Sequence, residues 1–128
     1  MSVVLDASAL LAYLHGEPGA EEVDSQLDGA LISSVNWSEV LQKSMVYGVD
    51  IVGLQEELTE LGLQVVPFDH EDASRTAWLW HITKSRGLSF ADRVCLALGV
   101  KTGRLVLTAD RVWKQCITPE LPEIFLIR

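Results

Sequence analysis

Four acidic residues stand where a folded α/β chain could gather them into one site: Asp6, Glu39, Asp92 and Asp110. Asp6 and Asp110 each come just past the end of a short apolar run that predicts a strand. Glu39 and Asp92 fall in or near the first turns of predicted helices. Because ligand sites in open α/β sheets lie outside the carboxyl ends of the strands, we expect the four carboxylates to converge on one edge of the sheet.

Four carboxylates in apolar surroundings repel one another unless a cation lies among them. We expect no basic side chain at i±4 to neutralise any of the four, since Arg93 and Arg111 are adjacent in sequence to Asp92 and Asp110 and point elsewhere on a helix. Oxygen ligands select Mg²⁺ or Mn²⁺ over Zn²⁺, which favours His and Cys. Three histidines lie outside these segments, and we expect surface or core positions for them: His15, His70 and His81.

Each acid also has an ordinary structural interpretation. Asp92 lies three residues after Ser89, the spacing of a capping box at the start of a helix. Asp6 and Asp110 could cap helices, and Glu39 could be a solvated helix residue. These interpretations stay open for each residue alone, and the coincidence of all four favours the metal site.

Short apolar runs predict five strands, at residues 3–5, 30–32, 64–67, 104–108 and 123–127. Helical patterns lie between them, over 9–14, a segment ending near 27, 33–48, 50–61, 69–86 and 88–99, with a brief helix at 112–114. Ser8 is the expected N-cap of the first helix, and Gly87 the expected residue just past the helix that ends at Arg86. Strands separated by helix-length segments imply a mainly parallel sheet with helices on both faces. We therefore predict a single α/β domain over 1–128.

The composition is that of a soluble globular protein, with 128 residues, 48% of them apolar and 22% charged. No apolar run approaches the roughly 18–20 residues that cross a bilayer. The segment 1–6 has no basic region typical of a signal peptide. Cys95 and Cys116 are too few for a disulfide framework, so we expect core thiols and a reducing, cytoplasmic location.

The net charge of −8 is unevenly distributed. Residues 1–72 hold 14 acidic residues and a single basic one, Lys43, whereas residues 73–128 hold 4 acidic and 9 basic residues. The average argues against simple coating of nucleic acid. The asymmetry allows an acidic site beside a basic rim, which suits a metal-dependent enzyme acting on a polyanion.

Several segments together carry a family resemblance: Asp6-Ala7-Ser8, Ser33-x-x-Asn36-x-x-Glu39, Gly87-Leu88-Ser89-x-x-Asp92-Arg93-x-Cys95 and Leu107-Thr108-Ala109-Asp110-Arg111-x-Trp113. In order and spacing they resemble the PIN-domain ribonucleases and, more narrowly, the VapC-type toxins of toxin–antitoxin pairs. The family's four acidic positions fall on the four acids above, and Ser8, Asn36 and Thr108 match polar positions that support the metal site in relatives. Trp78 and Trp80 depart from the small residues that relatives often carry.

The resemblance implies a PIN-like three-layer α/β/α fold and an Mg²⁺- or Mn²⁺-dependent endoribonuclease. Asp6, Asp92 and Asp110 would hold the metal, and Glu39 would bind it or orient the attacking water. Basic residues of the second half, such as Arg93 and Arg111, could guide RNA, with tRNA among the candidate substrates. The implied partners are a VapB-like antitoxin and a second copy of the chain in a homodimer, and no membrane.

Three alternatives differ in class. The chain could be a PIN-fold nuclease outside a toxin–antitoxin pair. A phosphoacceptor domain would use Asp6 as nucleophile, but Asp6-Ala7-Ser8 lacks the second acid of a D-x-D motif and Asp110 stands where a lysine is expected. A non-catalytic module would bind a partner helix in an apolar groove built from Leu10, Leu11, Leu14, Trp37, Val40 and Leu41.

Overall fold

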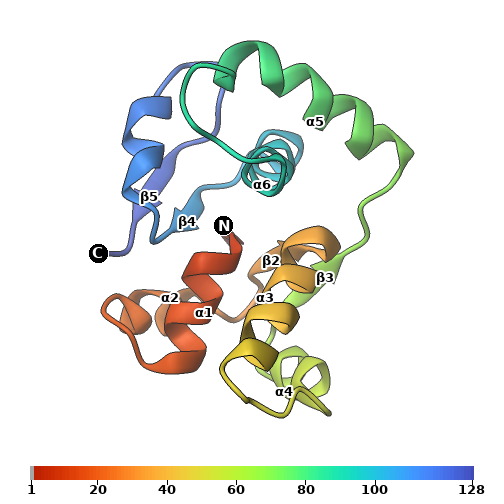
Figure 1. Ribbon diagram of the computed structural model, residues 1–128, viewed down its shortest axis with the longest axis vertical. Helices are drawn as coiled ribbons and strands as arrows, with labels where there is room; N and C mark the ends of the chain where they lie inside the picture. Colours follow the sequence, from red (N-terminus) through yellow and green to blue (C-terminus); the bar gives the residue numbers. More distant parts are fainter. Residues whose placement is uncertain (1) are drawn as a thin grey trace.

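The computed structural model describes residues 2–128 and contains a five-stranded sheet in the order β3-β2-β1-β4-β5 (Figure 1). The strands are β1 (Val4–Leu5), β2 (Leu31–Ser33), β3 (Gln64–Val66), β4 (Val106–Thr108) and β5 (Ile124–Leu126). Every neighbouring pair is parallel, because a helical segment separates successive strands along the chain. The predicted mainly parallel sheet of about five strands is confirmed. The predicted single domain covers residues 1–128, of which Met1 lies outside the described residues.

Within residues 2–128, six α-helices and one 3₁₀ helix cover the sheet: α1 (Ala7–His15), α2 (Ala20–Gln26), α3 (Ser34–Val46), α4 (Leu54–Glu60), α5 (His70–Thr83), α6 (Phe90–Thr102) and η1 (Arg111–Cys116). Helices α1 to α4 pack on one face, and α5 and α6 lie on the other (Figure 1). The result is the predicted three-layer α/β/α arrangement. No helix within residues 2–128 is both long enough and apolar enough to cross a bilayer.

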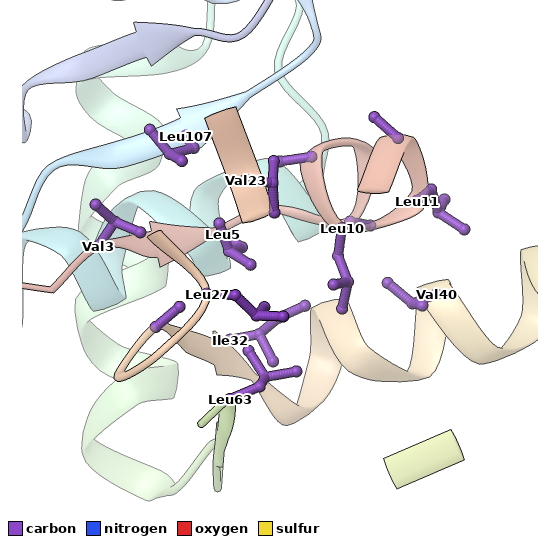
Figure 2. Close-up of a cluster of buried hydrophobic side chains, with 14 of the residues drawn as sticks. Val3, Leu5, Leu10, Leu11, Val23, Leu27, Ile32, Val40, Leu63 and Leu107 are labelled. Carbon is purple, nitrogen blue, oxygen red and sulfur yellow. The ribbon is translucent and has the colours of Figure 1, made fainter. Parts of the chain in front are cut away.

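The first strand shows why the sheet is the middle layer. Val3 and Leu5 belong to the core shared with α1, α2 and α3. Figure 2 shows both side chains in one apolar cluster with Leu10 and Ile32. Val4, between them, points to the opposite core under α5 and α6. All three side chains are buried, as expected for a strand covered on both faces. Cys95 and Cys116 are free thiols buried in the second core, as predicted.

The chain order places a crevice beside β1. After β1, the chain builds β2 and β3 to one side, then crosses to β4 on the other side of β1. Val4 therefore pairs with both Leu31 and Val106. Strand order reverses at this point, and the carboxyl ends of β1 and β4 open onto a common edge. Asp6 follows β1 directly, and Thr108 ends β4.

Several helix boundaries differ from the sequence prediction by one to four residues, and those of α1, α4 and α5 have a clear physical reason. Helix α1 begins at Ala7 with Asp6 as its N-cap, because the Asp6 carboxylate accepts from the Ala9 N–H at 2.8 Å, whereas the Ser8 hydroxyl accepts from the Ala109 N–H outside the helix. The prediction of Ser8 as N-cap is therefore wrong. Helix α4 begins at Leu54 rather than at residue 50, since Gly53 at its N-cap has a φ of +79° outside the helical region.

The predicted extension of α5 to Arg86 is also wrong. The helix ends at Thr83 with Lys84 as its C-cap. The Arg86 N–H donates to the Thr83 carbonyl at 2.9 Å, three residues back, so the chain tightens into a turn. Gly87, with a φ of +74°, therefore belongs to the connection leading into α6 and does not cap α5.

Candidate metal site

The four predicted acids line one pocket of about 220 Å³ at the carboxyl edge of the sheet. They come from the start of α1, the second turn of α3, the first turn of α6 and the residue before η1. The other side chains and backbone lining the pocket belong to Ala7, Ser8, Asn36, Lys43 and Ser89. The structure thus brings together four residues that span 105 positions of the sequence.

Asp6 is the buried member of the group, with 4% of its surface exposed. Its Oδ1 accepts from the Ser8 hydroxyl and from the Ala9 N–H, both at 2.8 Å, and its Oδ2 accepts from the Thr108 hydroxyl at 2.5 Å. Burial raises the pKa of Asp6 to about 6, against the opposing effect of these hydrogen bonds, and the negative charge of Asp92 raises it further. A buried carboxylate of this kind gains from a cation at the pocket.

Ser8 and Thr108 connect the Asp6 carboxylate to the backbone around Asp110. The Ser8 hydroxyl accepts from the Ala109 N–H at 2.9 Å, and the Thr108 hydroxyl accepts from the Asp110 N–H at 3.0 Å. Each hydroxyl therefore receives one backbone hydrogen bond and donates one to Asp6. This arrangement fixes the two acids at adjacent strand ends relative to each other.

Asp92 lies in the predicted capping box at the start of α6. The Asp92 N–H donates to the Ser89 hydroxyl at 3.2 Å, and the Ser89 N–H donates to Asp92 Oδ2 at 2.9 Å. Burial raises the pKa of Asp92, the bonds to Ser89 lower it, and the charges of Asp110 and Glu39 raise it. Capping and pocket lining are therefore compatible roles of the same side chain.

Asn36 ties α3 to α6 within the pocket. Its Nδ2 donates to the Ala91 carbonyl at 3.0 Å, next to Asp92 in sequence. The side chain is 1% exposed, and its Oδ1 has no hydrogen-bond partner among residues 2–128. A buried carbonyl oxygen without a donor is costly, so this atom is available to a cation or to an ordered water.

The expectation that no basic side chain lies at i±4 of the acids is wrong for Glu39. Lys43 follows it by four residues on α3, and Lys43 Nζ lies 3.1 Å from Glu39 Oε2. Both side chains are partly exposed, at 52% and 34%. Lys43 is the single basic residue of positions 1–72, and its spacing of four residues from Glu39 on a predicted helix is the signal that predicts this ion pair.

Asp110 caps η1, with its Oδ1 accepting from the Val112 N–H at 3.0 Å. The two arginines expected to guide RNA do not line the pocket. Arg93 donates to the Leu88 carbonyl at 3.2 Å, while Arg111 is exposed beside the site. Their contribution to a substrate path stays a prediction.

The donor set fits a hard divalent cation, although no three His, Cys, Asp or Glu side chains within residues 2–128 are close enough to coordinate one ion as they stand. Each carboxylate instead contacts a nearby hydrogen-bond donor or, for Glu39, the Lys43 ammonium, which is the arrangement expected of groups that repel one another. The groups that could bind a cation in this pocket are carboxylate, hydroxyl and amide oxygens, which hard divalent ions prefer. Four carboxylates face one ammonium, and Asn36 Oδ1 has no hydrogen-bond partner among residues 2–128. Rotations of the half-buried side chains of Glu39 and Asp110 would bring their oxygens inward.

The histidines, the two tryptophans of α5 and the residues of the proposed apolar groove lie outside the acidic pocket. None of the three histidines lines the pocket. Trp78 and Trp80 are exposed on α5. The six residues of the proposed apolar groove pack within or against the first core, and four of them are buried. Their burial leaves these four little surface for a partner helix, and the burial of Asp6 disfavours a phosphoacceptor.

Comparisons with known proteins bear on the family and the fold of the chain. The sequence matches the PIN domain family over residues 3–116. The fold resembles a toxin–antitoxin complex from Klebsiella pneumoniae, with 16% identity, a TM-score of 0.76 and coverage of 99% of this chain and 98% of that chain. It also resembles FitAcB from Neisseria gonorrhoeae, with 18% identity, a TM-score of 0.69 and coverage of 98% and 97%.

A further structural relative is VapBC-1 from nontypeable Haemophilus influenzae, with 16% identity, a TM-score of 0.70 and coverage of 99% of this chain and 98% of that chain. At these identities the structural likeness shows a shared fold. No curated protein matches the chain.

Proposed function

The chain belongs to the PIN domain family, whose members are generally nucleases, and from this premise we propose that it is a metal-dependent endoribonuclease acting as the toxin of a toxin–antitoxin pair. One observation carries the proposal: four carboxylates from separate elements line a single pocket where strand order reverses. The substrate class would be RNA, and the reaction hydrolysis of a phosphodiester bond.

In this proposal Asp6, Asp92 and Asp110 hold the cation, and Glu39 binds it or orients the attacking water. A bound Mg²⁺ or Mn²⁺ supplies positive charge that attracts the phosphate and favours ionisation of water, which carboxylates alone cannot do. The exposure of Glu39 suits contact with water and substrate.

The surrounding polar groups would position the acids. The hydroxyls of Ser8 and Thr108 would hold Asp6 in one orientation through two hydrogen bonds, and the amide of Asn36 would hold the first turn of α6. Because these groups sit on helices and strand ends rather than on long loops, the backbone that carries the carboxylates would stay in place when substrate arrives.

The proposed partners are a VapB-like antitoxin and a second copy of the chain. Structural relatives described as toxin–antitoxin complexes support the first. Exposed apolar side chains at the end of α3 and in the connection to α4 add to that support, because Val46, Tyr47 and Val52 would lose solvent contact against a partner. The cytoplasm is the compartment that holds RNA and an antitoxin together.

A cleavage assay with the purified protein tests the nuclease. Unfractionated cellular RNA is incubated with Mg²⁺, with Mn²⁺ or with EDTA, using wild-type protein and Asp92→Asn. We expect cleavage only for the wild type with a divalent ion. Equal rates under all conditions would contradict the proposal, because a contaminating nuclease would then explain the activity.

Brief expression in cells tests the toxin assignment and identifies the target. Sequencing the ends of RNA fragments would show whether one tRNA or another structured RNA accumulates cuts. Growth arrest that the Asp92→Asn variant does not cause supports a toxin. Cleavage without arrest would instead identify a PIN nuclease outside a toxin–antitoxin pair.

A further inference from the structure

Lys43 is the single basic residue of the first 72 positions, and it lines the acidic pocket. No other lysine or arginine within the described residues 2–128 lines that pocket. Lys43 lies one helical turn beyond Glu39 on α3, and its Nζ contacts Glu39 Oε2 at 3.1 Å. A lone ammonium among four carboxylates calls for an explanation beyond ordinary surface charge.

The Lys43–Glu39 pair is weak as a structural contact. Both side chains reach solvent, and exposed pairs at i,i+4 shift a folding equilibrium by only about twofold. Such a pair exchanges readily, because the flexible lysine stem can leave its partner without disturbing the helix. The contact can therefore be replaced when either group finds a stronger partner.

We propose that Lys43 contacts a phosphate of the nucleic acid substrate, and that Glu39 holds its ammonium at the pocket until a divalent cation engages the Glu39 carboxylate. This inference rests on the proposed nuclease function and adds a residue that binds substrate. In this proposal the ammonium contacts two anions in succession, first the Glu39 carboxylate and then a phosphate of the substrate.

Charge explains why a phosphate would need this lysine. The pocket presents four carboxylates, so a polyanion is repelled wherever their charges are not balanced. Arg93 is already engaged with the Leu88 carbonyl, and Arg111 lies outside the pocket lining. Lys43 is therefore the lysine or arginine that the pocket lining of residues 2–128 itself supplies, and an ammonium on a flexible stem suits contact with a phosphate oxygen.

RNA binding measured with Ca²⁺ tests the phosphate contact. Unfractionated tRNA is titrated with the wild type, Lys43→Gln, Lys43→Arg and Arg128→Gln, each with Ca²⁺ and with EDTA. Arg128 is the matched control, because it forms a similar exposed ion pair with Glu17 at 3.1 Å and does not line the pocket. We expect Lys43→Gln to weaken binding about fivefold to tenfold in Ca²⁺, little in EDTA, and Lys43→Arg to restore most of it.

The salt dependence separates a phosphate contact from a change in fold. Loss of one contact should reduce the slope of log affinity against log salt by about 0.7 to 0.9 for Lys43→Gln in Ca²⁺. An equal loss of affinity in Arg128→Gln would overturn the proposal, since general charge would then explain both. Unchanged affinity and slope in Lys43→Gln would overturn it as well.

A metal titration without RNA tests the exchange at Glu39. Because the ammonium competes with a cation for the same carboxylate, Lys43→Gln should bind Mn²⁺ about twofold more tightly than the wild type. Weaker or equal binding would contradict the exchange. Failure of the nuclease proposal has a different signature, in which wild-type protein cleaves no RNA with any divalent ion.

Discussion

Ser89 and Asp92 exchange two hydrogen bonds at the start of α6, each through its side chain to the other's backbone N–H. The box uses Oδ2 of Asp92, which leaves Oδ1 for another ligand. The same carboxylate lines the pocket with Asp110 and Glu39, whose charges raise its pKa. A cap and a cation ligand thus share one side chain, and substitutions can separate the two roles.

Asp92→Asn should abolish activity while leaving the fold nearly intact. Asparagine keeps an oxygen that can accept from the Ser89 N–H but removes the charge that a cation requires. We expect the activity loss to exceed the roughly 10–100-fold that outer-shell changes cost at metal sites. RNA cleavage with Mn²⁺ and urea denaturation measure the two effects on the same preparation.

Ser89→Ala is the matched variant for that comparison. It removes the capping hydroxyl and should lower the free energy of unfolding by about 1 kcal/mol, yet retain far more activity than Asp92→Asn. If the two variants lost stability equally and both regained full cleavage on refolding, Asp92 would be a capping residue only.

Local rules predicted the features that neighbouring residues determine. The capping box depends on the three-residue spacing between Ser89 and Asp92. The positions of Asp6 and Asp110 follow from the ends of short apolar runs that form strands. The N-cap of α1 was misassigned because Asp6 and Ser8 are both good caps two positions apart, and only the fold decides that Ser8 accepts from the distant Ala109 N–H while Asp6 caps the helix. The family resemblance, rather than periodicity, pointed to the supporting polar residues.

Contacts between distant segments lay beyond such rules. The Thr108 hydroxyl reaches Asp6 across 102 positions because β1 and β4 are neighbours, and Asn36 reaches Ala91 across 55 because α3 and α6 meet at their first turns. Strand order cannot be read from spacing alone. The pairing of Glu39 with Lys43 was local and could have been predicted from its helical spacing.

The metal-free protein should lose stability as the pH rises from about 4 to 6. Asp6 has a folded pKa of about 6 against 3.8 for a free carboxyl, so the folded state holds a proton that the unfolded state releases. Its stabilising contribution is complete below pH 3.8 and is lost as the pH rises through the folded value. A shift of this size corresponds to about 3 kcal/mol. The raised pKa of Asp92 acts in the same direction.

Urea denaturation in EDTA at pH 5 and pH 7 measures this effect, with Asp6→Asn as the comparison. The variant should show a flatter dependence on pH, since it carries no titratable group at the buried position. Mg²⁺ should restore stability to the wild type at pH 7 and much less to the variant. An identical pH dependence in both proteins would show that Asp6 does not carry the destabilising charge.

Gly99→Ala should destabilise the fold, although alanine is the better helix former. A Cβ at Gly99 would lie 2.7 Å from Val106 Cγ2 and 2.8 Å from Pro122 Cγ, so α6 could not pack as closely on β4. We expect a cost of about 1–3 kcal/mol from overpacking. Val100→Ala, at an exposed position of the same helix, should change stability by less than about 0.5 kcal/mol. Thermal unfolding of both variants checks the difference.

Asn36→Ala should reduce both stability and activity, because one side chain supplies two functions. Loss of the Nδ2 bond to the Ala91 carbonyl removes a link between α3 and the first turn of α6, at a cost of about 1 kcal/mol. Loss of Oδ1 removes an oxygen from the pocket. We expect cleavage to fall about tenfold and Mn²⁺ affinity to fall with it.

Ser44→Ala is the control on the same helix. Ser44 is as buried as Asn36, its hydroxyl has no partner among residues 2–128, and it does not line the pocket. Its removal should be neutral or slightly stabilising and should leave Mn²⁺ affinity unchanged. If Asn36→Ala lost stability but bound Mn²⁺ as the wild type does, Asn36 would only join α3 to α6, and its free oxygen would play no part in holding the cation.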